Sequence, residues 1–250
     1  MAKQQDDAII AALEEEAAQV LLMIEQNFQK QRETAKSVRP FFIEFSGTPK
    51  AGKTTIINSL RLFLSRNRYT VNVLVERAST SRIVDKLHLD FNVWTACATL
   101  IQMLDAAQWP GRNKIVILDR GLFDALAWMD WLRERGQLGD DDMQKVVEFL
   151  TIDHWRMFID MVFIMLTTPE ESLHREYKDQ VTKKPGRIMN AAAIQKFNES
   201  LQTTKEHYGH LFPRITEVWT LGDTLPEQTG REVVGKTLDT IRRILSQGTS

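Results

Sequence analysis

The chain has 250 residues, of which 43% are hydrophobic and 26% are charged, and this length and composition fit one sizeable globular domain with a small addition. A formal net charge of −1 gives no general attraction to nucleic acid or to a membrane surface, and no apolar run is long enough to span a bilayer. A single cysteine, Cys97, excludes an internal disulfide framework, and the acidic N-terminal segment is untypical of a signal peptide, so we expect a cytoplasmic location.

The first predicted element is an amphipathic helix over residues 6–32. Its apolar side chains recur every three or four residues, at Ile10, Leu13, Ala17, Val20, Leu21, Ile24 and Phe28. We assign residues 1–38 to this helix and a linker, and residues 39–250 to the main domain. The helix either packs on its own domain or pairs with another subunit, in a homodimer, or with a protein partner. About three heptads are too few to decide between these alternatives.

Strand-like and helix-like segments alternate over the rest of the chain. Predicted strands cover residues 41–45, 69–76, 114–119, 160–168 and 214–222. Predicted helices cover residues 53–67, 92–107, 121–135, 142–158, 169–180, 190–212 and 232–245, and proline-glycine pairs mark a turn at 109–113 and an interruption at 181–187. This alternation predicts an α/β fold with a parallel sheet between two layers of helices, and a ligand site beyond the carboxyl ends of the strands.

The segment GTPKAGKTT, residues 47–55, has the spacing of a phosphate-binding loop. Gly47 and Gly52 let the backbone curl so that several N–H groups face one centre, and the helix that follows adds its positive end. Lys53 can reach the β- and γ-phosphates, and Thr54 can offer its hydroxyl to Mg²⁺. We therefore expect ATP to be bound by Gly47, Thr48, Pro49, Lys50, Ala51, Gly52, Lys53, Thr54 and Thr55.

Charged residues follow the predicted third strand directly. Asp119 can hold Mg²⁺ through water, or it can serve only as a negative charge before the next helix. Arg120 offers a planar fork to a transferring phosphoryl group, and a surface salt bridge is the alternative. Asp124 and Trp128 follow at helical intervals from Arg120 and can line a pocket for a ring, although a tryptophan at such a position is also typical of a core.

The end of the second predicted strand reaches the same edge of the sheet. There Glu76 can accept a proton from a substrate hydroxyl, and Arg77 can bind a substrate phosphate, or both can be surface charges. A lid is predicted over about residues 169–190, where a basic segment can close over the phosphates or remain a solvated loop. Its basic residues are Arg175, Lys178, Lys183, Lys184 and Arg187.

These segments, in this order, resemble the nucleoside and nucleotide kinase branch of the phosphate-loop proteins, nearest to thymidylate kinases and deoxynucleoside kinases. The resemblance covers about residues 41–245. It rests on GTPKAGKTT as the phosphate loop, on ILDRGLFDALAW (117–128) as the Asp-Arg segment, and on TTPEESLHREYK (167–178) as the passage into a lid. It implies a three-layer α/β/α phosphate-loop NTPase fold whose five-stranded parallel sheet has the phosphate-loop strand in the middle.

The resemblance also implies roles for individual residues. Lys53 and Thr54 would bind phosphate and Mg²⁺, Asp119 would assist the metal, and Arg120 would clamp a substrate phosphate. Glu76 matches the base of the deoxynucleoside kinases.

The resemblance implies roles for two further arginines. Arg77 can match an arginine of the thymidylate kinases, and Arg175 would be a lid arginine. Thymidylate specificity does not follow, because residues 93–100 carry no acidic-arginine pair, residues 76–80 (ERAST) replace a glycine-rich motif, and Lys50 stands where those enzymes often have an acidic or small residue.

The sequence therefore predicts an ATP- and Mg²⁺-dependent phosphotransferase whose acceptor is a nucleoside monophosphate or a nucleoside, with no nucleic-acid or membrane partner. One alternative is a phosphate-loop NTPase that acts as a switch or regulatory protein, coupled to a partner through the N-terminal helix. Another is a kinase for a small molecule that is not a nucleotide. An enclosed pocket beside Glu76, Arg120 and Trp128 is the feature that would favour a kinase.

Overall fold

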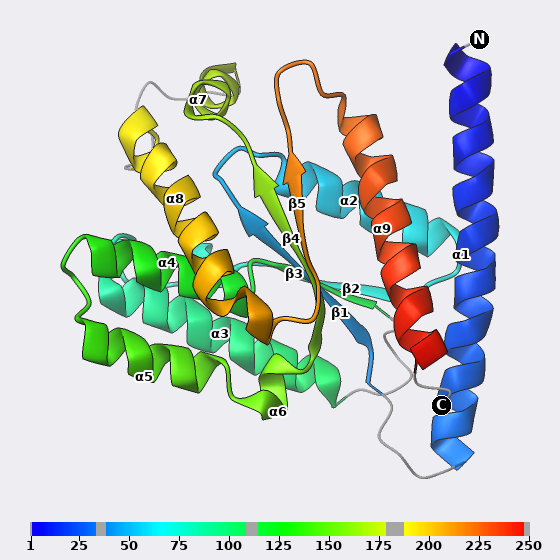
Figure 1. The fold of residues 1–250 in the computed structure, drawn as a ribbon, viewed down its shortest axis with the longest axis horizontal. Coiled ribbons are helices and arrows are strands. Elements are labelled where there is room, and N and C mark those ends of the chain that lie inside the picture. Colours follow the sequence, from blue (N-terminus) through cyan, green and yellow to red (C-terminus); the bar gives the residue numbers. More distant parts are fainter. Residues whose placement is uncertain (1, 34–38, 109–114, 179–187, 248–250) are drawn as a thin grey trace.

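The structure, a computed structural model, describes residues 2–33, 39–108, 115–178 and 188–247. Five parallel strands form one sheet in the order β2-β3-β1-β4-β5 (Figure 1). They are β1 (Phe41–Gly47), β2 (Val71–Leu74), β3 (Ile115–Asp119), β4 (Ile159–Leu166) and β5 (Ile215–Trp219). The predicted parallel sheet, with the phosphate-loop strand in the middle, is confirmed.

Helices cover both faces of the sheet. They are α1 (Ala2–Glu33), α2 (Lys53–Arg66), α3 (Leu89–Ala107), α4 (Leu122–Glu134), α5 (Asp140–Leu150), α6 (Asp153–Arg156), α7 (Pro169–Lys178), α8 (Ala191–Tyr208) and α9 (Pro226–Gln247), with the short 3₁₀ turns η1 (Arg77–Ser79) and η2 (Gly209–Leu211). Two predicted elements differ from the structure. The helix predicted over 142–158 is two separate helices, α5 and α6. The strand predicted over 69–76 is shorter, because the chain turns into η1 at Glu76. The turn predicted at 109–113 and the interruption at 181–187 lie outside the described residues.

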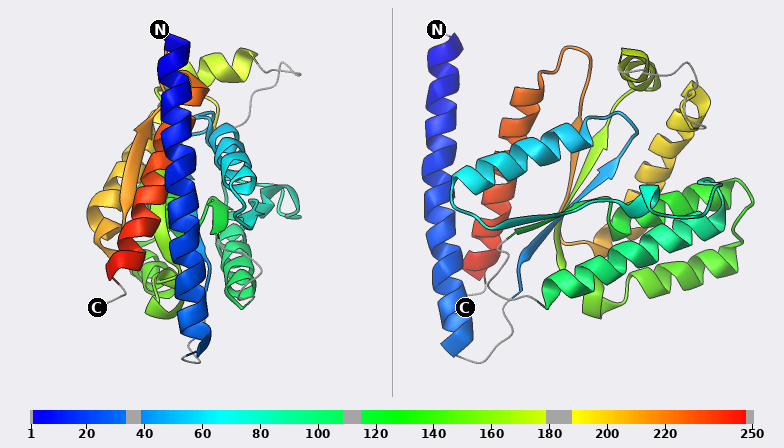
Figure 2. Two further views of the ribbon diagram at one scale, coloured as in Figure 1. Left: turned by 90° about the vertical axis from the view of Figure 1, so that its right-hand side faces the viewer. Right: turned by 180° about the vertical axis from the view of Figure 1, so that it is seen from behind.

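Two hydrophobic cores lie on opposite faces of the sheet. One core joins the sheet to α3, α4, α5 and α8, and the other joins it to α1, α2 and α9 (Figure 2). Every residue of β1 and β4 is buried, as expected for central strands that are covered on both faces. Alternation along β1 sends Phe41, Ile43 and Phe45 into the second core, and it buries Glu44 and Ser46 completely on the opposite face.

The N-terminal helix α1 packs on its own domain, alongside α9 (Figure 2). Its Val20 and Ile24 side chains are completely buried in the core that α9 shares. The Tyr69 hydroxyl donates a hydrogen bond to the Ala17 carbonyl oxygen at 2.7 Å, which ties the helix to the start of β2. Pairing of α1 with another subunit or a partner stays a prediction. Across the described residues, no helix has the length and apolar character needed to cross a membrane.

Candidate active site

The phosphate loop connects β1 to α2, and its backbone requires glycine. Gly47 and Gly52 have φ angles of 134° and 83°, in the region that side chains disfavour. A Cβ atom on Gly47 would lie 1.9 Å from the Met165 carbonyl oxygen in β4, so no other residue fits there. Lys50 also has a positive φ, 59°, which gives the loop the tight curl expected from its sequence.

Hydrogen bonds from neighbouring elements fix the outside of this loop. Four successive loop residues are each held in this way: Thr48 Oγ1 donates to Asn198 Oδ1, Ser172 Oγ donates to Pro49 O, Arg175 Nη1 donates to Lys50 O, and Thr220 Oγ1 donates to Ala51 O. The loop is therefore held in its curled form by α7, α8 and the end of β5.

The Lys53 side chain bonds back to the first residues of the loop. Its Nζ donates to the carbonyl oxygens of Gly47 and Thr48 at 2.8 and 2.9 Å. Burial, and next the nearby charge of Arg120, lower the pKa of Lys53 to about 7. A bound anion would stabilise the charged forms of both Lys53 and Arg120. This is the electrostatic property expected of a phosphate site.

Arg120 forms ion pairs with two carboxylates, one in the turn that follows β2 and one on α4. Its Nε lies 3.2 Å from Glu76 Oε2, and its Nη1 donates to Asp124 Oδ2 at 2.8 Å. Asp124 is 2% exposed, and its other oxygen accepts from Ser46 Oγ at 2.7 Å and from Gly47 N at 3.3 Å. Asp124 therefore connects the arginine to the base of the phosphate loop.

The charged side chains around Arg120 shift one another's pKa values. Burial raises the pKa of Glu76, and the positive charge of Arg120 opposes that rise. Burial also raises the pKa of Asp119, against the effect of Lys53 and Arg120. Burial alone lowers the pKa of Arg120, but Asp124 and Glu76 outweigh it and raise the pKa above its ordinary value. Arg120 therefore stays charged inside the site.

Asp119 and Thr54 are the two residues predicted to bind Mg²⁺. Asp119 ends β3 opposite Phe45 of the phosphate-loop strand, and Thr54 is exposed in the first turn of α2. Mg²⁺ takes oxygen ligands and keeps several waters and substrate phosphates, so it needs few protein groups. A carboxylate and a hydroxyl fit that requirement, whereas the described ranges hold no group of three or more His, Cys, Asp or Glu side chains that could bind a metal by themselves.

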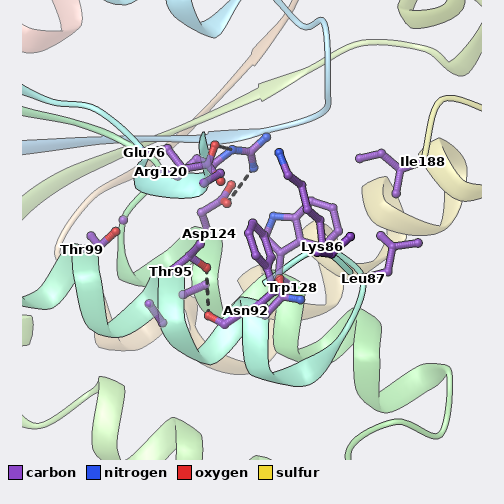
Figure 3. A pocket seen from close by; sticks show the side chains of 16 residues that line it. Glu76, Lys86, Leu87, Asn92, Thr95, Thr99, Arg120, Asp124, Trp128 and Ile188 are labelled. Carbon is purple, nitrogen blue, oxygen red and sulfur yellow. Dashed lines mark hydrogen bonds and ion pairs between the residues drawn. The ribbon is translucent and has the colours of Figure 1, made fainter. Parts of the chain in front are cut away.

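A cavity of about 460 Å³ opens beside Glu76 and Arg120. Trp128 forms one wall and stacks on Phe197, with ring centroids 4.1 Å apart. Figure 3 shows Glu76, Arg120 and Asp124 gathered in one part of this cavity. The other lining residues are Ala78, Val84, Lys86, Leu87, Phe91, Asn92, Thr95, Ala96, Thr99, Gly121, Ala125 and Ile188. A pocket beside Glu76, Arg120 and Trp128 is therefore present.

Asn92 and Lys86 are two of the polar lining residues that were not predicted as site residues. Asn92 is 5% exposed, and its Nδ2 donates to the His88 carbonyl oxygen at 2.9 Å. Within the described part of the chain its Oδ1 has no hydrogen-bond partner, so this oxygen can accept a bond from a ligand. Lys86 enters the cavity from the loop before α3. In the sequence, Asn92, Thr95 and Thr99 have the spacing of one helix face, and this polar face was the pattern that could have identified Asn92 as a site residue.

Arg77 differs from the other predicted substrate-binding residues. It is exposed in η1 and lines a separate groove of about 570 Å³ along the edge strand β2. Glu76, Arg120, Asp124 and Trp128 all line the 460 Å³ cavity, and of these four only Glu76 also borders the groove of Arg77. The structure therefore brings four of these five residues together and leaves Arg77 outside.

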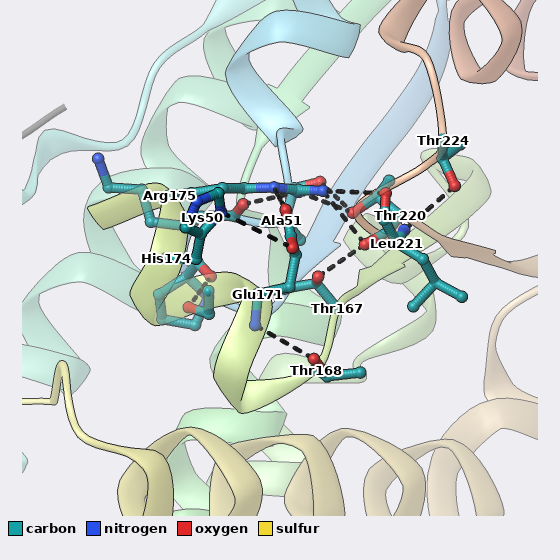
Figure 4. A network of polar contacts seen from close by, with 12 residues as sticks. Lys50, Ala51, Thr167, Thr168, Glu171, His174, Arg175, Thr220, Leu221 and Thr224 are labelled. Carbon is teal, nitrogen blue, oxygen red and sulfur yellow. Dashed lines mark hydrogen bonds and ion pairs between the residues drawn. The ribbon is translucent and has the colours of Figure 1, made fainter. Parts of the chain in front are cut away.

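Arg175 joins α7 to the phosphate loop and to the end of β5 (Figure 4). Its Nε donates to Glu171 Oε1 at 2.7 Å, and its Nη1 donates to Lys50 O and to Thr220 Oγ1, each at 3.1 Å. With Gly52, it lines a second cavity, of about 330 Å³. A lid role for Arg175 stays a prediction, and Lys183, Lys184 and Arg187 lie outside the described residues.

Comparisons with known proteins identify the fold. No known family profile matches the sequence, and no curated protein matches it.

Solved structures of deoxyadenosine kinase from M. mycoides are similar to this chain. The one with products dCMP and a flexible dCDP has a TM-score of 0.60 at 14% identity, and covers 79% of this chain and 98% of that chain. The dATP-bound structure has a TM-score of 0.59 at 13% identity, and covers 79% and 99%. The dCTP-bound structure has a TM-score of 0.57 at 14% identity, and covers 80% and 100%. The chain therefore has the fold of a phosphate-loop nucleoside kinase.

Proposed function

We propose that this protein is a kinase that transfers the γ-phosphoryl group of ATP to an acceptor the size of a nucleoside. The observation that carries the proposal is the cavity of about 460 Å³ beside the Arg120–Glu76 pair, at the edge of the sheet that holds the phosphate loop. A switch NTPase needs only water as acceptor, whereas a cavity of this size with an aromatic wall fits a ring-containing substrate. The shared fold with deoxyadenosine kinases supports the same conclusion.

The residues around Glu76 suit a direct transfer. Glu76 would accept the proton of the acceptor hydroxyl while that oxygen bonds to the γ-phosphorus, and the bond from phosphorus to the β–γ bridging oxygen would break to release ADP. Lys53 and Arg120 place positive charge where negative charge develops. When bound by Thr54 and Asp119, Mg²⁺ would neutralise part of the phosphate charge.

A nucleoside is the acceptor that this geometry favours. The Nε and Nη1 atoms of Arg120 are already paired with Glu76 and Asp124, which supports a role as partner of the catalytic base Glu76 over a role as an unpaired clamp for a substrate phosphate. A nucleoside monophosphate is the second candidate. Lys86 favours it, because this lysine enters the same cavity and has no ion pair among the described residues.

Ring recognition would come from α3 and α4. Trp128 offers an apolar face to a planar base, and its stacking on Phe197 fixes the orientation of the indole. Asn92 has its amide group oriented by the bond from Nδ2 to His88 O, so its Oδ1 would accept a hydrogen bond from a ring or exocyclic N–H group. The adenine of ATP would lie in the second cavity, beside Arg175 and Gly52.

Labelled ATP tests this proposal. The purified protein is incubated with [γ-³²P]ATP, Mg²⁺ and a panel of nucleosides and nucleoside monophosphates, with Lys53→Ala as the inactive control. We expect label on at least one nucleoside. Label on monophosphates alone would support the second candidate, and Arg120→Ala should then weaken acceptor binding sharply instead of lowering mainly the rate. Release of labelled phosphate to water, with no labelled acceptor, would contradict the nucleotide-kinase proposal.

A further inference from the structure

One buried carboxylate takes no part in the chemistry proposed above. Glu44 lies in the middle of β1, three residues before Gly47, and its exposed fraction is 0%. A carboxylate is rarely buried unless specific partners hold it. The partners of Glu44 therefore indicate what it does.

Those partners are backbone N–H groups at the start of α4. Oε1 of Glu44 accepts from Gly121 N at 3.0 Å and from Asp124 N at 2.8 Å, and Oε2 accepts from Phe123 N at 3.2 Å. The first N–H groups of a helix have no partner within that helix. Gly121, at the N-cap of α4, has no side chain to supply one. Glu44 thus caps α4 from a different element of the fold.

The carboxylate of Glu44 lies directly against the backbone of Gly121. A Cβ atom on Gly121 would lie 2.4 Å from both Cδ and Oε2 of Glu44. The side chain of Glu44 therefore occupies the space that any larger residue at position 121 would need. This close approach explains a glycine directly after Arg120.

Arg120 itself has an unusual backbone. Its φ angle is +69°, a conformation that residues other than glycine adopt only when the surrounding structure holds them. Arg120 N donates to Phe45 O at 2.9 Å, and the next amide, Gly121 N, donates to Glu44. Two adjacent residues of β1 therefore hold the two amides of this turn, and the guanidinium points to Glu76 and Asp124.

We infer that Glu44 is a positioning residue for phosphoryl transfer, which holds the turn of Arg120 at a fixed place relative to the phosphate loop. Glu44 lines neither of the two cavities proposed for the substrates, and it acts through the backbone of α4. Because β1 leads directly into Gly47, one strand sets the position of both the loop and the arginine. This inference rests on the proposed kinase function.

The variant Glu44→Gln tests the role with little change in size. It keeps one acceptor oxygen and replaces the other with an N–H₂ group, which meets the N–H donors of α4. Asp160→Asn is the matched control. Asp160 is also a buried carboxylate, 6% exposed, and it accepts from Arg39 and from Phe42 N near the start of β1, away from the cavity.

In assays above pH 8, where Glu44 is ionised and accepts with both oxygens, we expect Glu44→Gln to lower kcat by about 10- to 100-fold while KM for ATP changes by less than about twofold, because a small misplacement of a charged group is costly in the transition state. Asp160→Asn should leave kcat within about twofold of the wild type. Equal kcat values in all three proteins would overturn the inference.

A second readout needs no acceptor. Deuterium exchange in residues 119–126 should become faster in Glu44→Gln and stay unchanged in Asp160→Asn, because only the first variant loses a bond to these amides. This result decides the positioning role even if no acceptor in the panel is labelled. Unchanged exchange in Glu44→Gln would contradict the inference, whereas failure of phosphoryl transfer alone would contradict only the proposed function.

A variant on the opposite side of the contact covers the case in which Glu44→Gln does not fold. Gly121→Ala pushes against Glu44 and should give the same faster exchange and lower kcat. Gly139→Ala is its control, because Gly139 is the N-cap glycine of α5 and its Cβ would meet nothing within 4 Å. Equal exchange over 119–126 in the two glycine variants would overturn the proposed role of Glu44.

Discussion

Arg120 Nε lies 3.2 Å from Glu76 Oε2, and this contact joins the end of β3 to the turn that follows β2. The two strands are neighbours in a parallel sheet, so their carboxyl ends meet at one edge. The contact places a cation directly beside the group that we propose as the base. It therefore defines the point at which acceptor and phosphate would meet.

Loss of the proposed base should reduce the rate of transfer. Glu76→Gln removes the proton acceptor, and we expect kcat to fall by about 10²- to 10⁴-fold with little change in KM for ATP. Steady-state kinetics with an acceptor from the panel measure both constants. Asp105→Asn is the control, because Asp105 borders the groove along β2 but does not line the 460 Å³ cavity. A Glu76→Gln enzyme with wild-type kcat would rule out Glu76 as the base.

Removal of the loop lysine should abolish most turnover without unfolding the protein. Lys53→Ala deletes a charged donor at the transferring phosphate, which should cost about 3 kcal/mol, or about a hundredfold in rate. The free energy of unfolding should not fall markedly, because burial already disfavours the charged form of Lys53 and lowers its pKa to about 7. Turnover assays and thermal melts check the two parts. Equal turnover in wild type and variant would show that the loop is not the site.

Much of this site follows from local sequence. The glycine and lysine spacing of residues 47–54 identifies the phosphate loop, and parallel strand order brings Glu76 and Asp119 to one edge. A pocket beside Trp128 follows from the helical interval between Arg120 and Trp128.

Other parts of the site depend on contacts between residues distant in the chain, which local patterns do not contain. Glu44 binds backbone amides 77 to 80 residues away, and Arg175 binds the loop carbonyl of Lys50 across 125 residues. Arg77 illustrates the opposite case. It directly follows Glu76, yet the 3₁₀ turn leads it away from the cavity.

The free energy of unfolding should depend on pH through Glu44. Burial raises the pKa of Glu44 from 4.5 to about 8 in the folded protein. The folded state therefore binds a proton that the unfolded state releases, and this stabilising contribution decreases as pH rises from 4.5 to about 8. Urea titrations at several pH values should show a slope of roughly 1.4 kcal/mol per pH unit at most from this group. Glu44→Gln should lose that part of the slope, and an identical pH profile for the two proteins would contradict the assignment.

The contact of α1 with the domain should contribute measurably to stability. Ile24 has an exposed fraction of 0%, so Ile24→Ala should lower the free energy of unfolding by about 2–5 kcal/mol. Leu22 on the same helix is 56% exposed, and Leu22→Ala should change it by less than about 0.5 kcal/mol. Urea denaturation compares the two variants. Equal effects would show that α1 does not pack on α9 as described. ATP binding should persist in both folded variants, because the hydrogen bonds described above for the phosphate loop come from α7, α8 and the end of β5.

The most direct test of the account follows both products of the reaction at once. ³¹P NMR of the protein with ATP, Mg²⁺ and a mixture of nucleosides records ADP, inorganic phosphate and any new phosphomonoester in one spectrum. A kinase should form about one phosphomonoester for each ADP, and Glu76→Gln should suppress both signals together. Formation of ADP with an equal amount of inorganic phosphate and no new phosphoester would contradict the central claim that the cavity beside Arg120 and Glu76 receives a nucleoside.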